Sequence, residues 1–179
     1  MYKQIIDQTP KGVDKKKVYH ITGGLEPLTF PRIGDLVSYG EQSGFDMEIQ
    51  TNGSYLTSDF IEKHSGIKDL SILRVSLYGV DSDSTFEVTK NKRAYHIVKE
   101  NLINFLKLNT KTKLGLNYVI LHNHTDDILK LLNYIEEINI KSDKQIDFLT
   151  LRENFAEEAN DILGDERKKI HDIFNEIQK

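Results

Sequence analysis

The segment VYHITGGLEPLTF, residues 18 to 30, decides how the rest of the chain is interpreted. A short run of β-forming residues leads directly into Gly23 and Gly24, and such a pair lets a backbone approach a ligand closely because neither residue has a Cβ. Glu26 adds a carboxylate just beyond the strand, and in repeating β/α proteins ligands bind at the carboxyl ends of the strands. A strand followed by a tight turn is the plainer interpretation. The remainder of the chain decides between the two.

Strand-like and helix-like segments alternate along the whole chain. Hydrophobic patterning predicts strands over residues 18–22, 45–51, 70–78, 113–122 and 147–151. It predicts helices over residues 2–8, 31–43, 57–65, 93–108 and 128–138, a helix cap at 125–127, a polar loop over 79–92, and one or two helices over 156–178, broken near Gly164. Strands that alternate with helices of this length are typical of βαβ units, so we expect a parallel sheet.

One face of the predicted sheet is unusually polar. In the third strand Arg74 and Ser76 alternate with Leu73, Val75 and Leu77, and the second and fifth strands alternate in the same way. Strands buried on both faces read instead as continuous apolar runs. The pattern therefore favours a curved sheet, or partial barrel, whose inner face encloses a ligand cavity. An open sheet with one solvated face is the alternative.

Composition excludes several classes of function. The chain has 179 residues, a net charge of −4 and no cysteine, which fits a single domain and rules out thiolate catalysis or a thiolate metal site within these residues. The longest apolar runs have the length of strands, and the first residues lack the apolar core of a signal peptide. We therefore expect a cytoplasmic protein that acts on neither a membrane nor a nucleic acid.

Several motifs, in order, resemble those of radical S-adenosylmethionine enzymes. The segment GGLEP at 23–27 resembles the GGE(P) motif of that family, and QTNG at 50–53 resembles its TNG segment. RVSLYG at 74–79, the TFE and RAY tripeptides at 85–87 and 93–95, and the strand at 117–123 resemble the segments that follow. The resemblance covers residues 18 to 154. The inserted leucine of GGLEP is similar to the variant found in members that act on sugars or sugar nucleotides.

The resemblance implies a fold and two cofactors. The fold is α/β, a parallel sheet of about five strands with helices on the outer face, forming a partial (β/α)₆ TIM-like barrel that lacks its first strand. Residues 1–154 would form this barrel and residues 155–179 a charged helical tail. Family members bind S-adenosylmethionine and a [4Fe–4S] cluster held by a CxxxCxxC loop. That loop is absent here, so we interpret the chain as a catalytically inert fragment; a natural paralogue without a cluster is the alternative.

The resemblance also assigns candidate residues. Gly23, Gly24 and Glu26 would bind the amino group of S-adenosylmethionine, and Ser76 its carboxylate or ribose. The remaining candidates for the cofactor are Asn52, Arg93, Val119 and Leu121, and Arg152 is the candidate for a substrate phosphate or carboxylate. The plainer roles are these: Asn52 can hold its turn, and the Ser76 hydroxyl can bond locally within the sheet. Arg93 can be an ordinary surface arginine, Arg152 can form a structural ion pair, and Val119 and Leu121 can belong to the core. We expect Glu26, Asn52, Ser76 and Arg152 to open into one cavity.

Two other functions stay open on the residues alone. The chain could be a non-catalytic barrel that binds a nucleoside or sugar phosphate, or a different β/α enzyme with Glu48 and Glu26 as an acid/base pair. His122 and His124 do not make a metal site, because no third ligand is evident. The expected partner is a small molecule, and the unpaired edge of the first strand predicts a homodimer or a terminal segment that covers it.

Overall fold

Five strands form one parallel sheet in the computed structural model, which describes residues 2–10, 12, 14, 19–120, 125–153 and 164–177. The order of the strands in the sheet is their order in the chain. They are β1 (Tyr19–Ile21), β2 (Met47–Thr51), β3 (Ile72–Leu77), β4 (Lys113–Ile120) and β5 (Phe148–Glu153). The five predicted strands and their parallel arrangement are therefore confirmed.

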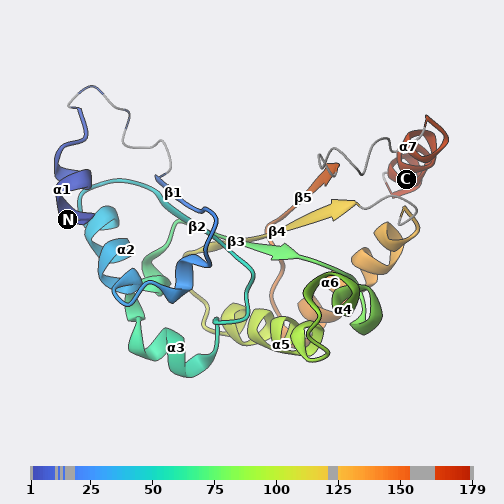
Figure 1. Ribbon diagram of the computed structural model, residues 1–179, viewed down its shortest axis with the longest axis horizontal. Helices are drawn as coiled ribbons and strands as arrows, with labels where there is room; N and C mark the ends of the chain where they lie inside the picture. Colours follow the sequence, from blue (N-terminus) through green and yellow to red (C-terminus); the bar gives the residue numbers. More distant parts are fainter. Residues whose placement is uncertain are drawn as a thin grey trace.

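The connecting helices lie on one side of this sheet (Figure 1). Crossover connections between parallel strands are right-handed, so strands that follow one another in order place their helices on the same face. The helices are α1 (Tyr2–Asp7), α2 (Ile33–Gln42), α3 (Ser58–Lys63), α4 (Ser82–Thr89), α5 (Ala94–Lys107), α6 (Asp127–Ser142) and α7 (Gly164–Ile177), with short 3₁₀ turns η1 (Pro27–Thr29) and η2 (Ser65–Asp69). This is the wall of a partial (β/α) barrel, as the sequence predicts.

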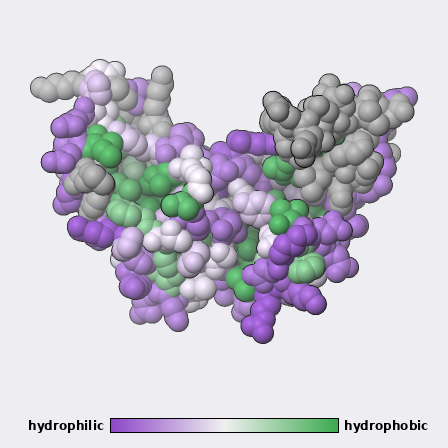
Figure 2. All heavy atoms as spheres, in the orientation of Figure 1, coloured by the Kyte–Doolittle hydropathy of each residue, from purple (hydrophilic) through white to green (hydrophobic). Residues whose placement is uncertain are grey.

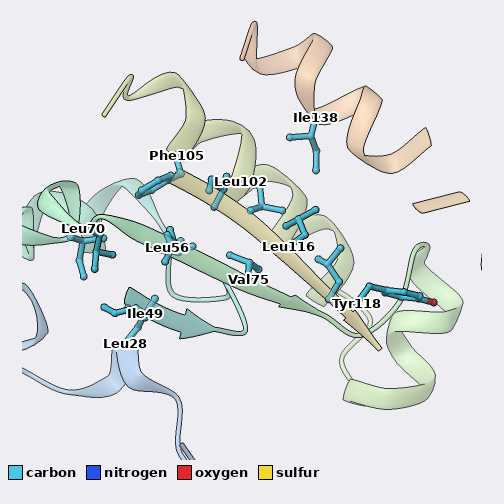
Figure 3. Packing of buried hydrophobic residues seen from close by; sticks show 14 of the residues in the cluster. Leu28, Ile49, Leu56, Leu70, Val75, Leu102, Phe105, Leu116, Tyr118 and Ile138 are labelled. Carbon is cyan, nitrogen blue, oxygen red and sulfur yellow. The ribbon is translucent and has the colours of Figure 1, made fainter. Parts of the chain in front are cut away.

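The hydrophobic core lies between the outer face of the sheet and these helices. Ile49, Leu73, Val75 and Leu116 are fully buried on the strands, and Phe105 packs against them from α5 (Figure 3). Hydrophilic residues cover much of the surface seen in Figure 2, and hydrophobic residues show there only in separate patches. The outer face of the sheet thus supplies the apolar surface that holds the helices in place.

The inner face of the sheet is polar, as the alternation predicts. In β3 the residues of the outer face are buried, while Ile72, Arg74 and Ser76 on the inner face are half-buried. In register, Arg74 lies between Gln50 of β2 and Gly115 of β4. A sheet whose helices cover one face and whose other face is polar has the curved, one-sided architecture of a barrel wall.

One predicted loop is a helix. The sequence analysis expects no regular structure over 79–92, but Ser82–Thr89 form α4. Asp81 caps this helix: its carboxylate accepts a hydrogen bond from the backbone N–H of Ser84 at 2.8 Å, and the Ser84 hydroxyl accepts one from the backbone N–H of Asp81 at 3.2 Å. A capping box with serine in place of the usual glutamate is a weak sequence signal, which explains the error.

Two further boundaries differ from the expectation. Helix α6 continues to Ser142, four residues beyond the predicted end, and stops at Asp143, whose φ of 55° is left-handed. Its N-cap Asp126 forms no side-chain cap hydrogen bond, and Asp127 instead pairs with Lys130 at 3.0 Å.

Helix α7 begins at Gly164; the domain boundary at 154 stays a prediction. Within the described residues no helix is both long and apolar enough to span a membrane.

Candidate functional site

The loop after β1 leaves its backbone open at the C-terminal edge of the sheet. Gly23 has a φ of +145°, a conformation that side-chain-bearing residues rarely adopt, and both Gly23 and Gly24 are exposed. A Cβ at either position would meet no atom within 4 Å. The loop borders a hollow of about 680 Å³ that is also lined by the start of α2. This space lets a ligand reach the glycine backbone.

The Glu26 carboxylate ties this loop to the end of β2. Its Oε1 atom accepts hydrogen bonds from the Thr51 hydroxyl at 2.5 Å and from the Leu28 N–H at 3.2 Å. Its Oε2 atom accepts one from the backbone N–H of Asn52 at 2.9 Å. We call this set of contacts the Glu26 latch. It gives Glu26 a structural role that the sequence analysis did not assign, because only the fold brings residues 26 and 52 together.

Asn52 begins a turn that is held from two sides. Its side-chain oxygen accepts hydrogen bonds from the backbone N–H of Ser54 at 2.9 Å and from the Ser54 hydroxyl at 2.5 Å. The buried amide of Asn101, on α5, donates to the carbonyl oxygens of Gly53 at 2.9 Å and Ser54 at 3.2 Å. The turn role foreseen for Asn52 is thus present, and Asn101 is a supporting residue that sequence reasoning missed.

A cavity of about 180 Å³ opens beside this turn, at the ends of β2 and β3. Ser76 reaches it from the inner face, and the Ser76 hydroxyl accepts a hydrogen bond from Gln50 at 3.2 Å. Aromatic and small polar side chains from β3 and from α4, α5 and α6 form the remaining walls. The lining residues are Asn52, Ser54, Ser76, Leu77, Tyr78, Gly79, Thr85, Thr89, Asn91, Ala94, Tyr95, Val98 and Tyr134.

The aromatic wall of this cavity is uncharged. Burial raises the pKa of Tyr134, so its phenol stays protonated at neutral pH. Behind the wall, burial alone would lower the pKa of Lys99, but its hydrogen bonds to Glu137 and Tyr95 outweigh that effect and raise it. The Lys99 ammonium lies 5.3 Å from the centre of the Tyr95 ring and 5.1 Å from that of Tyr134. The cavity therefore offers hydroxyl and amide groups and aromatic surface.

The structure brings some predicted site residues together and separates others. Asn52 and Ser76 line the same cavity, whereas Glu26 lines the neighbouring hollow, because its carboxylate turns toward β2 to form the latch. Instead of the expected single cavity the structure has two hollows. The hydrogen bond from the Asn52 N–H to the Glu26 carboxylate connects their walls. Arg152 borders neither hollow; it lies in register with Val119 on the inner face.

The other candidates have the following surroundings. Val119 is 38% exposed and so is not a core residue, which removes the plainer role proposed for it. Arg93 is exposed at the N-cap of α5, next to Ala94 in the cavity wall. Leu121 and the histidines 122 and 124 lie outside the described residues. Elsewhere in the described chain, no group of three His, Asp or Glu side chains is placed to hold a metal ion.

A second polar network lies deeper on the inner face. Arg74 donates from Nε to the Glu48 carboxylate at 2.8 Å and from Nη1 to Asn117 at 3.1 Å and Thr150 at 2.9 Å. Glu48 also lies 3.4 Å from Nδ1 of His20. The polar alternation of the strands was the signal for this network. Glu48 belongs to this network and Glu26 to the latch, so the two carboxylates have different hydrogen-bond partners.

The comparisons with solved structures define the class of fold. The chain matches TYW1 with a lysine-pyruvate adduct bound at a TM-score of 0.65 and 23% identity, covering 89% of this chain and 50% of that one. It matches Streptococcus suis SuiB bound to S-adenosylmethionine at a TM-score of 0.67 and 18% identity, covering 90% of this chain and 36% of that one. These neighbours are radical S-adenosylmethionine enzymes with TIM-like barrels, and the chain shares their parallel β/α fold while spanning half or less of their length.

Two curated relatives match the full length of the chain in sequence. The dTDP-4-amino-4,6-dideoxy-D-glucose ammonia-lyase of Streptomyces venezuelae is 29% identical, and the chain covers 38% of it. The tungsten-containing aldehyde ferredoxin oxidoreductase cofactor-modifying protein of Pyrococcus furiosus is 25% identical, with 50% covered. No family model matches. In sequence and in fold the chain is thus similar to radical S-adenosylmethionine enzymes, which confirms the resemblance that its motifs indicate.

Proposed function

We propose that this chain is the S-adenosylmethionine-binding part of a radical S-adenosylmethionine enzyme that acts on a sugar or sugar nucleotide. The observation that carries the proposal is the C-terminal edge of the sheet, where the open Gly23-Gly24 backbone, Asn52 and Ser76 come from three consecutive strands. The whole of this chain matches 38% of an ammonia-lyase named for a dTDP-amino sugar, and that match supports the substrate class.

The residues at this edge fit the chemistry of S-adenosylmethionine. Backbone carbonyl groups in the open glycine loop can accept hydrogen bonds from its ammonium group. The Ser76 hydroxyl and the Asn52 side chain, which line the same cavity, can serve its carboxylate or ribose. Val119, exposed on the inner face, offers apolar surface for adenine.

The residues present do not fit the iron–sulfur cluster of the family. Cluster irons are held by cysteine thiolates, and the 179 residues contain no cysteine. This chain can bind and orient the cofactor, but it supplies no ligand to a cluster, and we expect it to be catalytically inert by itself. In the family the cluster supplies the electron that cleaves S-adenosylmethionine.

Calorimetric titration of the chain with S-adenosylmethionine tests the binding role. We expect saturable one-to-one binding, weakened about tenfold in Ser76→Ala because the bound cofactor then loses its hydrogen bond with the Ser76 hydroxyl. Ser38→Ala, a serine on α2 whose hydroxyl donates to Asp69 at 2.8 Å, is the matched control and should bind normally. Absence of binding by the unaltered chain would refute the proposal. So would equal binding by Ser76→Ala and the unaltered chain.

The absence of cysteine also favours the second candidate, a non-catalytic barrel that binds a nucleoside or sugar phosphate. Anaerobic reconstitution with iron and sulfide separates the outcomes. We expect no stoichiometric iron–sulfur absorption from this chain, and its appearance would overturn the expectation of inertness. Saturable binding of dTDP without binding of S-adenosylmethionine would favour the second candidate over the first.

A further inference from the structure

Four polar side chains, one from each of four neighbouring strands, form a cluster on the inner face of the sheet. Glu48, Arg74, Asn117 and Thr150 belong to β2, β3, β4 and β5, and we call them the inner-face cluster. Arg74 connects the other three by hydrogen bonds of 2.8 to 3.1 Å. The cluster lies below the C-terminal edge: its members occupy the first half or the middle of their strands. The edge site described above does not use them.

Asn117 has a buried donor without an acceptor. Its side-chain oxygen accepts from Arg74, which can only donate, so the orientation of the amide is fixed and Nδ2 points elsewhere. The residue is 3% exposed, and within the part of the chain that the structure describes Nδ2 has no hydrogen-bond partner. An orphaned buried donor keeps its full desolvation cost, and such groups are rare in folded proteins. A ligand that supplies an acceptor oxygen at this position would remove that cost.

The residues around Asn117 indicate how a ligand would be oriented on the inner face. Its partners in register on the inner face, Ser76 and Thr150, are half-buried, so the inner face is partly open on both sides of the buried amide. Arg152 lies on the same face two residues beyond Thr150, about 6.6 Å further along the strand, and it is exposed. Among the described residues Arg152 has no ion pair, whereas the charges of Arg74 and Glu48 neutralise each other. The deep end is therefore polar and neutral, and the edge end is cationic.

We propose that the inner face binds the sugar ring of a sugar nucleotide in one orientation. The ring lies deep, where Asn117 Nδ2 donates to one of its oxygens, and the diphosphate lies at the edge, where Arg152 pairs with it. Neutral donors and acceptors suit hydroxyl groups, and a guanidinium fork suits phosphate. This inference rests on the proposed function and names the part of the substrate that each residue recognises.

Binding of two probes, dTDP-glucose and dTDP, separates the ring from the diphosphate. Asn117→Asp keeps the shape of the side chain and the contact with Arg74 but removes the donor. We expect it to weaken dTDP-glucose binding about tenfold and to leave dTDP binding unchanged. Arg152→Gln should weaken both. Asn133→Asp, on the exposed side of α6, carries the same change of charge and should affect neither probe. Equal loss for both probes in Asn117→Asp, or no loss, would overturn the proposal.

A measurement on the unaltered chain guards against a variant that folds poorly. In ¹⁵N-labelled protein the Asn117 side-chain amide resonance should move downfield with dTDP-glucose, because its protons gain an acceptor, and should stay in place with dTDP. An unmoved resonance at saturating dTDP-glucose, or failure of dTDP-glucose to bind, would refute the inference. Titration with S-adenosylmethionine in the same samples keeps the two proposals apart: its binding can succeed while the ring subsite fails, and the reverse.

Discussion

Replacing Glu26 with alanine tests whether the latch holds the C-terminal edge together. The change removes the acceptors of the Thr51 hydroxyl at 2.5 Å and of the Asn52 N–H at 2.9 Å; the third contact, to Leu28, is local and longer at 3.2 Å. A hydrogen bond to a charged group contributes about 1.5 kcal/mol or more. Glu26 is half-buried, so water replaces part of the lost hydrogen bonding. We therefore expect Glu26→Ala to lower the free energy of unfolding by about 2 to 3 kcal/mol.

Urea unfolding measures this loss directly. For a chain of this size 1 kcal/mol corresponds to about 2 to 4 °C in Tm, so Glu26→Ala should melt about 5 to 10 °C lower. Glu26→Gln should lose less, about 1 kcal/mol, because its remaining oxygen can serve Asn52 while the Thr51 hydroxyl rotates. Glu62→Ala on the exposed face of α3 is the control and should stay within about 0.5 kcal/mol of the unaltered chain.

Hydrogen exchange adds a local test of the same prediction. The backbone amide of Asn52 should lose protection in Glu26→Ala, since its acceptor is gone, while amides in the middle of β4 keep theirs. A stability of Glu26→Ala within 0.5 kcal/mol of the unaltered chain, with the Asn52 amide still protected, would refute the reasoning. Glu26 would then be free to serve a ligand alone.

Three further predictions concern the supports of the site. The cap hydrogen bond from the backbone of α4 lowers the pKa of Asp81, so its stabilising effect is present above the ordinary value of about 3.9 and is lost as the pH falls below it; Asp81→Ala should lower stability by about 1 kcal/mol, and the difference from the unaltered chain should shrink in melts at acid pH. Asn101→Asp replaces the donor to the Gly53 carbonyl with an acceptor and should cost about 2 kcal/mol in urea unfolding, a prediction that fails if the midpoint is unchanged. Gly115→Ala would place a Cβ 2.0 Å from the Phe148 ring and should cost about 1 to 3 kcal/mol, with disturbed Phe148 ring resonances as the check; intact resonances at full stability would contradict it.

Local pattern was enough to predict the sheet and most helices. Apolar and polar residues alternate regularly around Val75. This alternation was enough to predict the strand β3, its two faces and the curvature of the sheet. Helix α4 was missed because its capping box lacks the usual acidic or amide residue at the third position. Its signal is a pairing of two short polar side chains, which a sequence shows equally well in a loop.

The site was predictable as a set of residues but not as a geometry. The motifs placed Asn52 and Ser76 at neighbouring strand ends, and the structure brings both to one cavity. The turn of the Glu26 carboxylate toward β2 could not be foreseen, because it depends on which donors the fold leaves unpaired at residues 51 and 52. The partnerless amide of Asn117 is likewise a property of three-dimensional contacts alone.

The hydrogen bonds of Arg74 have a consequence for the order in which the chain folds. They join residues that are 26, 43 and 76 positions apart in sequence. Contacts that close such long loops form slowly compared with the local contacts of helices. Thr150 can be reached only after β5 has docked on β4, so the complete network marks the end of assembly. We expect substitutions at Thr150 to speed unfolding and to leave the folding rate nearly unchanged, as is usual for interactions absent from the transition state.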